Sequence, residues 1–153
     1  MLYENSDEPY CEELAKAITN EIRRGNRIDT TTKLRNVIEK TLDFLPNNKE
    51  KKDIIKKTCQ RTFQALRIDV NNEFEVLYEF MEKLPGALKP GGRVAILTFH
   101  SGEDKLVKKA LKAGYKEGIY SEYARDVVRP SAQECAQNGR ARSTKMRWAV
   151  KAE

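Results

Sequence analysis

One short segment, Arg93–Phe99, limits the folds available to this chain more than any other. It reads Arg-Val-Ala-Ile-Leu-Thr-Phe, an apolar, β-branched run without polar alternation. A run of this kind and length predicts a strand that is buried on both faces in a mainly parallel sheet. Helices must cover such a sheet, so we expect an α/β fold. No apolar run approaches the roughly 18 residues that cross a bilayer, so we expect no membrane association.

The residues before this strand show helical periodicity. Helices are predicted over residues 6–24 and 30–45, the second capped by its threonines. Residues 47–57 are a lysine-rich connector with one or two helical turns. Apolar residues then recur at spacings of three and four over residues 61–84, which predicts one long amphipathic helix.

The residues after the strand alternate between further short elements. We expect a helix over residues 103–111, an irregular tyrosine-rich loop over 114–124, a short strand over 126–129, a helix that begins at the Ser131–Glu134 capping box, and a last strand over 143–151. The chain should therefore comprise a helical segment, residues 1–58, and a second part, residues 59–153, that contains the sheet.

The positive charge of the chain is concentrated in its last part. Residues 1–90 hold 16 basic and 16 acidic side chains, whereas residues 91–153 hold 13 basic and 7 acidic ones, which accounts for the net charge of +6. Such a patch suits a polyanion, of which nucleic acid is the commonest, although surface lysines that only favour solubility are the alternative. The basic residues crowded toward the end are Arg125, Arg129, Arg140, Arg142, Lys145, Arg147 and Lys151.

The cysteines and the histidine argue against two classes of site. Cys11, Cys59 and Cys135 are an odd number without close spacing, which predicts free thiols and a cytoplasmic location instead of a disulfide framework. His100 is the only histidine, so we expect no transition-metal site.

The carboxyl end of the predicted strand is the best candidate for a ligand site. Ligands of open α/β sheets bind at this end of the strands, and here Phe99, His100 and Ser101 offer a ring, an imidazole and a hydroxyl. Ser101 could instead cap the following helix, but capping explains neither Phe99 nor His100. No glycine-rich phosphate loop is present, because Gly91-Gly92 precedes the strand instead of following it.

Four segments carry unusual combinations of residues in a fixed order. They are Arg61–Ile68 (RTFQALRI) with Asn71-Asn72-Glu73, Pro90–Arg93 leading into Thr98–Ser101 with Glu103-Asp104-Lys105, Arg129–Ser131, and Arg140–Ser143 with Lys145. Together they resemble the ribosomal RNA small subunit methyltransferase H family, which methylates N4 of a cytidine in 16S rRNA. The chain departs from the family pattern at Gly102, where a larger residue is usual, and at Lys105, where arginine is usual.

The resemblance implies a fold and a cofactor. The fold would be a helical, insertion-domain-like segment followed by the C-terminal part of a Rossmann-like class I methyltransferase sheet. The cofactor would be S-adenosylmethionine, but the family binds it with an N-terminal half that this sequence does not contain. We therefore assign no cofactor-binding or catalytic residue, and we expect the chain alone to be inactive.

The resemblance also implies two sets of site residues. Phe99, His100 and Ser101 are candidates for a pocket that holds a flipped cytidine, although His100 could equally be a structural hydrogen-bonding residue. The candidates for RNA binding are Arg129, Arg140, Arg142 and Lys145, with Arg61 and Arg67 as residues that could instead pair with acidic groups of their own helix.

The expected partners are 16S rRNA in the small ribosomal subunit and a second polypeptide. The apolar strand would leave an unpaired edge, which predicts either a homodimer or a complex with a separate methyltransferase half. Two other interpretations stay open: a non-catalytic RNA-binding or accessory module derived from the family, and an unrelated helical interaction domain.

Overall fold

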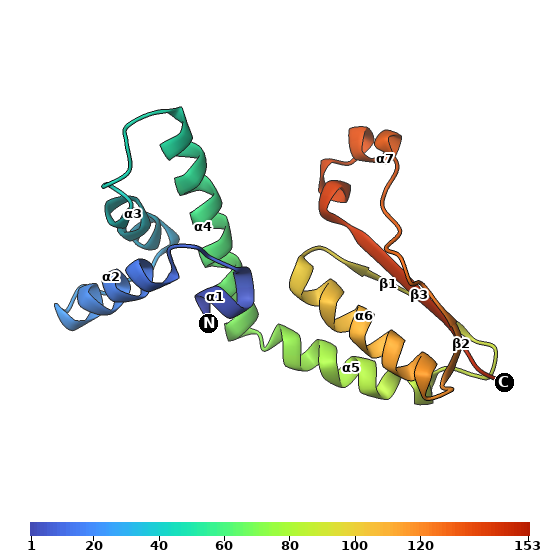
Figure 1. Ribbon diagram of the computed structural model, residues 1–153. Helices are drawn as coiled ribbons and strands as arrows, with labels where there is room; N and C mark the ends of the chain where they lie inside the picture. The colour runs from blue at the N-terminus through green and yellow to red at the C-terminus, as the bar shows by residue number, and fades with distance from the viewer. The chain divides into compact units, whose positions relative to one another are not determined.

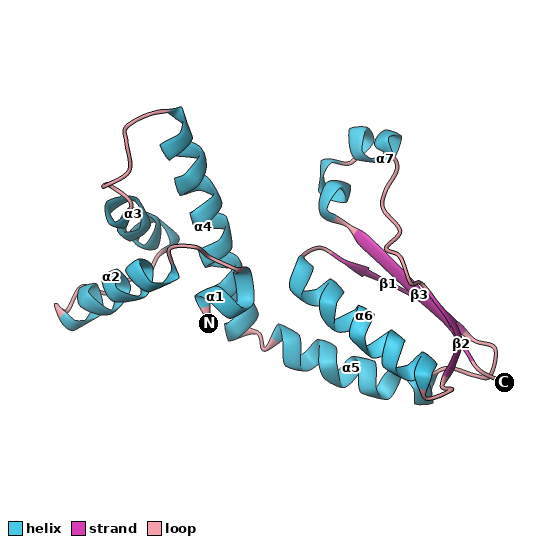
Figure 2. Ribbon diagram, in the orientation of Figure 1, coloured by secondary structure: helices cyan, strands magenta, loops and turns pink.

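The computed structural model describes all 153 residues as two compact units, Met1–Asn71 and Asn72–Glu153 (Figures 1 and 2). The sequence suggests a division at residue 58, whereas the units divide at residue 71 because one helix runs through the expected boundary. No helix of the protein combines the length and the apolar character needed to span a membrane.

The first unit consists of four helices. They are α1 (Leu2–Ser6), α2 (Cys11–Arg23), α3 (Thr31–Thr41) and α4 (Lys49–Val70). The α3 helix begins as expected, since the Thr30 hydroxyl accepts the Lys33 N–H at 3.2 Å. The helix expected over residues 6–24 corresponds to α2, which begins only at Cys11. The residues before it belong to α1, which ends where Asp7 adopts a left-handed φ of 50°.

The core of the first unit surrounds one buried carboxylate. Leu14, Ile38 and Leu42 are fully buried in its apolar cluster. Glu8 is also fully buried, and its Oε1 accepts the Tyr10 N–H at 3.1 Å and the hydroxyl of Thr58 at 3.3 Å. Burial of a carboxylate requires such partners, so this group ties the start of α2 to α4.

The prediction of one long helix over residues 61–84 is wrong. The structure has two helices, α4 and α5 (Glu73–Ala87), separated by Asn71 and Asn72. Asn72 adopts a left-handed φ of 49°, which asparagine tolerates better than most residues. The lysine-rich segment 47–57 is not a connector either, because α4 begins at Lys49, where the Asn48 side chain accepts the Lys51 N–H at 2.9 Å.

The second unit is a three-stranded sheet with helices on one face. Its strands are β1 (Arg93–Thr98), β2 (Tyr120–Tyr123) and β3 (Lys145–Lys151), in the order β1-β3-β2, and both pairings are antiparallel. The α5 helix and α6 (Ser101–Lys116) pack on one face (Figure 2). The unit is thus mixed α/β, but the expected parallel pairing of these strands is wrong.

The β1 strand is covered on one face only, which corrects the expectation of burial on both. Val94 and Ile96 pack into the cluster that contains Val107 of α6, whereas Ala95 and Leu97 are exposed. A continuous apolar run therefore does not by itself show that both faces are covered. β1 is also an edge strand, because β3 is its only neighbour.

The segment between α6 and β3 differs from the sequence-based expectation. Residues 120–123, expected in a loop, form β2 because Tyr120 is buried against α6 and Tyr123 packs beside it. The expected strand over 126–129 is reduced to one bridge between Val128 and Met146. The helix predicted from the capping box is confirmed as α7 (Ala132–Gln137), and a 3₁₀ helix, η1 (Gly139–Ser143), follows it.

Candidate functional site

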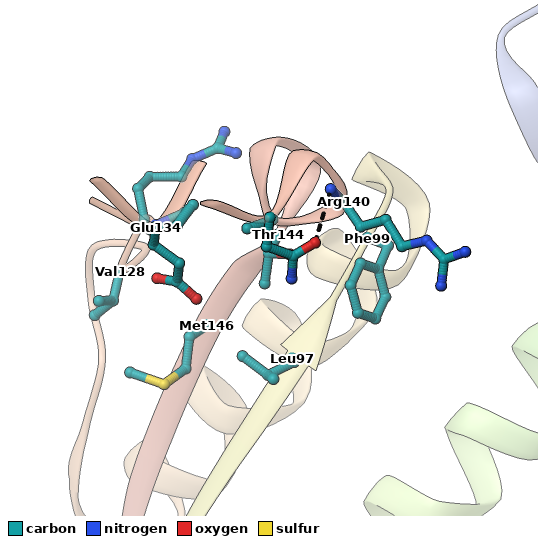
Figure 3. Close-up of a pocket in the computed structure, with 11 residues that line it drawn as sticks. Leu97, Phe99, Val128, Glu134, Arg140, Thr144 and Met146 are labelled. Atoms are coloured by element: carbon teal, nitrogen blue, oxygen red, sulfur yellow. Dashed lines mark hydrogen bonds between the residues drawn. The ribbon is translucent and has the colours of Figure 1, made fainter. Parts of the chain in front are cut away.

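A pocket of about 320 Å³ lies at the end of β1 in the second unit (Figure 3). Leu97 and Met146, which are paired across β1 and β3, form its floor together with Val128. The walls come from Phe99 and from the α7–η1 segment. The wall and rim residues are Phe99, Arg129, Pro130, Glu134, Asn138, Arg140, Ala141 and Thr144.

Local capping interactions place the polar groups of this pocket. The Ser131 hydroxyl accepts the Glu134 N–H at 3.1 Å, which starts α7 with Glu134 in its first turn. The Asn138 Oδ1 accepts the Arg140 N–H at 3.1 Å, which starts η1 with Arg140 beside the pocket (Figure 3). Two short helices in succession therefore bring a carboxylate and an arginine to the same cavity.

The pocket combines exposed apolar surface with positive charge. Leu97, Phe99 and Val128 are 57%, 55% and 43% exposed, which is a high exposure for neighbouring apolar side chains. Arg129 and Arg140 supply two positive charges against the single negative charge of Glu134. Exposed apolar side chains grouped in this way mark a binding site, and the arginines favour an anionic ligand.

Of the three residues predicted to line a common pocket, the structure places only Phe99 there. His100 is turned the other way, where its ring meets that of Phe74 edge-on at 5.8 Å between centroids. Its Nδ1 accepts the Glu103 N–H at 3.4 Å, so His100 and not Ser101 is the N-cap of α6. Ser101 is an exposed first residue of that helix. The position of His100 therefore fits the role of a structural hydrogen-bonding residue better than that of a pocket residue.

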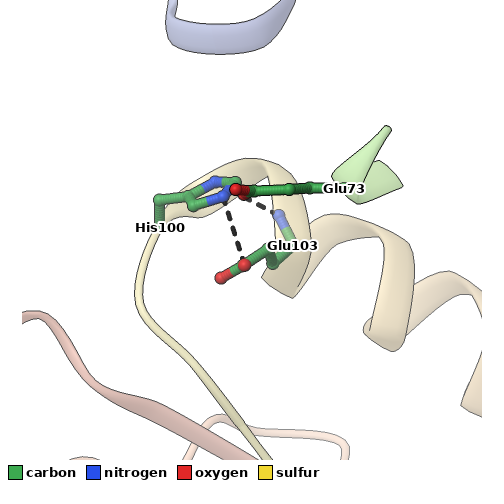
Figure 4. A group of neighbouring side chains, drawn as sticks. All are labelled: Glu73, His100 and Glu103. Carbon is green, nitrogen blue, oxygen red and sulfur yellow. Dashed lines mark hydrogen bonds and ion pairs between the residues drawn. The ribbon is translucent and has the colours of Figure 1, made fainter. Parts of the chain in front are cut away.

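His100 instead belongs to a small cluster with Glu73 and Glu103 (Figure 4). One carboxylate oxygen from each glutamate and one imidazole nitrogen of His100 all lie within 4.8 Å of one another. The His100 Nε2 is 3.4 Å from the Glu103 Oε1. Glu103 also accepts the Phe99 N–H at 3.0 Å. Glu103, rather than His100, therefore holds the Phe99 backbone in the turn after β1.

The predicted RNA-binding residues fall into three groups. Arg129 and Arg140 line the pocket, as described above. Arg142 is exposed on η1, and Lys145 begins β3 opposite Thr98.

The remaining two candidates, Arg61 and Arg67, belong to α4 of the first unit. The Arg61 Nη1 lies 3.8 Å from the buried Glu8 Oε2, so this guanidinium is the counter-charge of a buried carboxylate. The alternative weighed for Arg61 from the sequence, an ion pair with an acidic residue, is therefore correct in kind, although the partner is on another segment.

Arg147 counts toward the basic end of the sequence but is not part of its surface. It is 4% exposed, and its Nε and Nη2 donate to Asp104 of α6 at 2.7 and 3.1 Å. Its Nη1 donates to the carbonyls of Ala124 and Arg125 at 3.4 and 3.3 Å. The buried arginine thus holds the segment after β2, which leads to the pocket, against β3.

Glu134, Met146 and Leu97 line the pocket, but the sequence pattern does not indicate any of them as a binding residue. The pattern indicates Glu134 only as part of a capping box, and that role is also real. The register that pairs Leu97 with Met146 depends on antiparallel pairing, which no local pattern reveals.

The glycines of this chain do not form a cradle for S-adenosylmethionine. After β1, a Cβ on Gly102 would lie 2.7 Å from the Phe74 ring, so this glycine allows close packing of α5 on α6. Before β1, Gly91 has a φ of 69° and donates its N–H to the Lys151 carbonyl at 3.1 Å, which closes a turn. These two glycines serve packing and a turn, so they do not fit a cofactor cradle.

An apolar pocket with a few charged groups at its rim is typical of small-ligand binding sites. The sequence profile of the MraW methylase family matches residues 1–152. The chain belongs to the MraW methylase family, which confirms the resemblance seen in the sequence.

Several relatives carry the name ribosomal RNA small subunit methyltransferase H. One from Agathobacter rectalis is 89% identical over 153 residues, which is 100% of this chain and 44% of that protein. One from Lachnoclostridium phytofermentans is 72% identical over 152 residues, covering 99% and 41%. One from Mesomycoplasma hyopneumoniae is 40% identical over 150 residues, covering 94% and 47%. The chain thus spans less than half the length of these curated relatives.

Proposed function

We propose that this chain is the RNA-contacting portion of an S-adenosylmethionine-dependent methyltransferase that modifies N4 of a cytidine in 16S rRNA, in the cytoplasm. The match of the MraW methylase family over residues 1–152 carries this proposal. The names of the relatives supply the substrate, since they are called ribosomal RNA small subunit methyltransferases. The arginine-rimmed pocket supports an RNA-binding role for the second unit.

In this proposal the cofactor site lies outside residues 1–153, in a methyltransferase half that packs against this part of the sheet. β1 is an edge strand with exposed Ala95 and Leu97, and such edges pair readily with another strand. The rest of a methyltransferase sheet would fill that position and bring its cofactor beside the pocket. If that half is absent, a second copy of this chain is the alternative partner for the edge of β1.

One other function is favoured by a specific observation. The pocket is complete within the second unit, whereas the glycines around β1 serve turns and packing. A non-catalytic RNA-binding or accessory module would need only the pocket. Calorimetric titration of the chain with S-adenosylmethionine bears on both interpretations, because tight binding would show that no second polypeptide is needed for the cofactor.

RNA titrations test the proposed function directly. A labelled fragment of the 16S decoding centre should bind the chain with an affinity that falls as salt rises. The Arg140→Ala, Arg142→Ala double variant should bind more weakly, with a salt slope smaller by about two, one for each phosphate that an arginine no longer neutralises.

A matched control removes the same charge from elsewhere in the unit. Lys109 and Lys112 are exposed on α6, the helix that covers the other face of the sheet. Their replacement by alanine should leave most of the salt slope in place. Equal losses from both double variants would mean that net charge alone drives binding, and an unchanged slope in the Arg140/Arg142 variant would refute this RNA surface.

A further inference from the structure

We propose that the pocket at the end of β1 binds a single unpaired ribonucleotide and that Glu134 selects cytosine and adenine over uracil through their exocyclic amino groups. This inference rests on the proposed RNA-binding function and adds a residue that determines base preference. It concerns binding only, and it involves no methyl transfer.

The size and the apolar lining of the pocket suit one base. Its volume of about 320 Å³ is at the lower end of the range for small-ligand sites. The exposed Phe99 ring stands on one side of the floor formed by Leu97 and Met146 (Figure 3). A base that stacks on this ring would cover apolar surface that is now in contact with water, and stacking of this kind tolerates any base.

The charges give the bound nucleotide an orientation. Arg140 lies on the same side as Phe99, whereas the Glu134 carboxylate points down toward Met146 and Val128 on the opposite side (Figure 3). Glu134 repels a phosphate and Arg140 attracts one, so we place the phosphate on the Phe99 side, and Arg129 is the alternative phosphate partner in the pocket lining. The edge of the stacked base then faces Glu134.

Glu134 has the properties needed to recognise that edge. Its backbone N–H is used by Ser131, but its carboxylate makes no hydrogen bond or ion pair within the protein. An ionised carboxylate only accepts hydrogen bonds. It can therefore accept a hydrogen bond from the amino group of cytosine or adenine, whereas uracil presents its O4 acceptor at the same position.

Short oligoribonucleotides of otherwise uniform sequence test this preference. Fluorescence anisotropy with U5, with the same pentamer carrying one central C, and with one carrying one central A should show about tenfold to hundredfold tighter binding of the C and A forms, the range for one hydrogen bond to a charged group. Glu134→Gln should abolish the preference, because a side-chain amide can donate to uracil O4 as well as accept from an amino group.

Two further variants separate stacking from base recognition. Phe99→Ala should weaken binding of all three pentamers about tenfold or more and leave the preference among them unchanged. Glu117→Gln removes the same charge from an exposed position at the end of α6 and should change nothing. Urea unfolding followed by Trp148 fluorescence shows whether each variant keeps the stability of the second unit.

The possible outcomes distinguish this inference from the proposed function. Binding of all three pentamers with equal affinity by the unmodified chain, or a preference that survives in Glu134→Gln, overturns base selection and leaves RNA binding intact. If neither the pentamers nor the 16S fragment bind, the proposed function is wrong, and this inference is wrong with it.

Discussion

Replacement of Asp104 should destabilise the second unit more than any surface charge change. Asp104 and Arg147 form a two-pronged ion pair between α6 and β3, with N–O distances of 2.7 and 3.1 Å. The side chains are only 14% and 5% exposed, so water can replace neither partner. Asp104→Ala would leave the Arg147 guanidinium buried without a counter-charge.

The expected cost is about 3–5 kcal/mol, the range for removing one partner of a buried ion pair. The lower part of that range applies here, because the carbonyls of Ala124 and Arg125 would still accept from Arg147. Even about 3 kcal/mol is a large share of the 5–15 kcal/mol by which ordinary domains are stable. The Asp104→Leu, Arg147→Met double variant removes both charges and should recover most of the loss.

The same pair should make stability depend on pH in acid. Hydrogen bonds from Arg147 hold the pKa of the Asp104 carboxyl below its usual range, and the positive charges of Arg147, Lys145 and Lys108 act in the same direction against the effect of burial. Because the folded pKa is lower than the unfolded value of about 3.9, the stabilisation is complete above that pH. It is lost as pH falls through the folded pKa, and Asp104→Ala should lack this part of the acid dependence.

Trp148 is the only tryptophan and lies on β3, so its fluorescence during urea unfolding reports on the second unit. The matched control is Glu79→Ala, which removes the partner of Lys83 in an exposed pair on α5 and should cost less than about 1 kcal/mol. If Asp104→Ala cost no more than Glu79→Ala, the buried pair would not hold α6 and β3 together, and the reasoning would be wrong.

Three further changes test other parts of the structure. Gly102→Ala should destabilise the second unit by about 1–3 kcal/mol, because the new Cβ would lie 2.7 Å from the Phe74 ring, and Phe74→Leu should relieve this in urea unfolding. His100→Ala should cost about 1 kcal/mol through loss of the α6 cap, His100→Asn should cost less, and neither should change RNA affinity; weaker RNA binding at unchanged stability would restore His100 to the pocket. In sedimentation at micromolar concentration the chain should exceed its monomer mass of 17.6 kDa, and Ala95→Lys on β1 should reduce association; a monomeric unmodified chain would contradict pairing at this edge.

The parts of the fold that depend on local signals could be predicted from the sequence. Thr30 begins α3 and the Ser131–Glu134 capping box begins α7, because a side-chain cap acts within three residues. The β1 strand is predicted within one residue of its end for a similar reason, since its composition and the glycine turn before it are local.

The parts that depend on distant contacts could not be predicted. The apolar spacing continues from α4 into α5, so periodicity gives no sign that Asn72 breaks the helix with a left-handed φ. The antiparallel register of β1 is set by β3, a strand that comes more than forty residues later in the sequence. Tyr120 forms a strand because α6 covers its ring, which residues 114–124 alone cannot show.

The candidate site shows the same division at the level of single residues. Phe99 and His100 are neighbours in sequence, and in extended backbone neighbouring side chains point to opposite sides. One therefore lines the pocket while the other caps α6 against Phe74. Arg140 and Arg147 look alike in a count of charges, but Arg147 is buried because β3 alternates between its two faces and turns this residue toward α6.

The open face of the sheet connects the pocket with the edge of β1. Leu97 and Met146 form the pocket floor, and the next pair along the same face, Ala95 and Trp148, lines a second hollow beside Arg93. A polypeptide that paired with β1 and covered Ala95 and Trp148 would therefore add a wall next to the nucleotide pocket. Such a polypeptide should raise RNA affinity, and by reciprocity RNA should raise the affinity of the chain for that polypeptide.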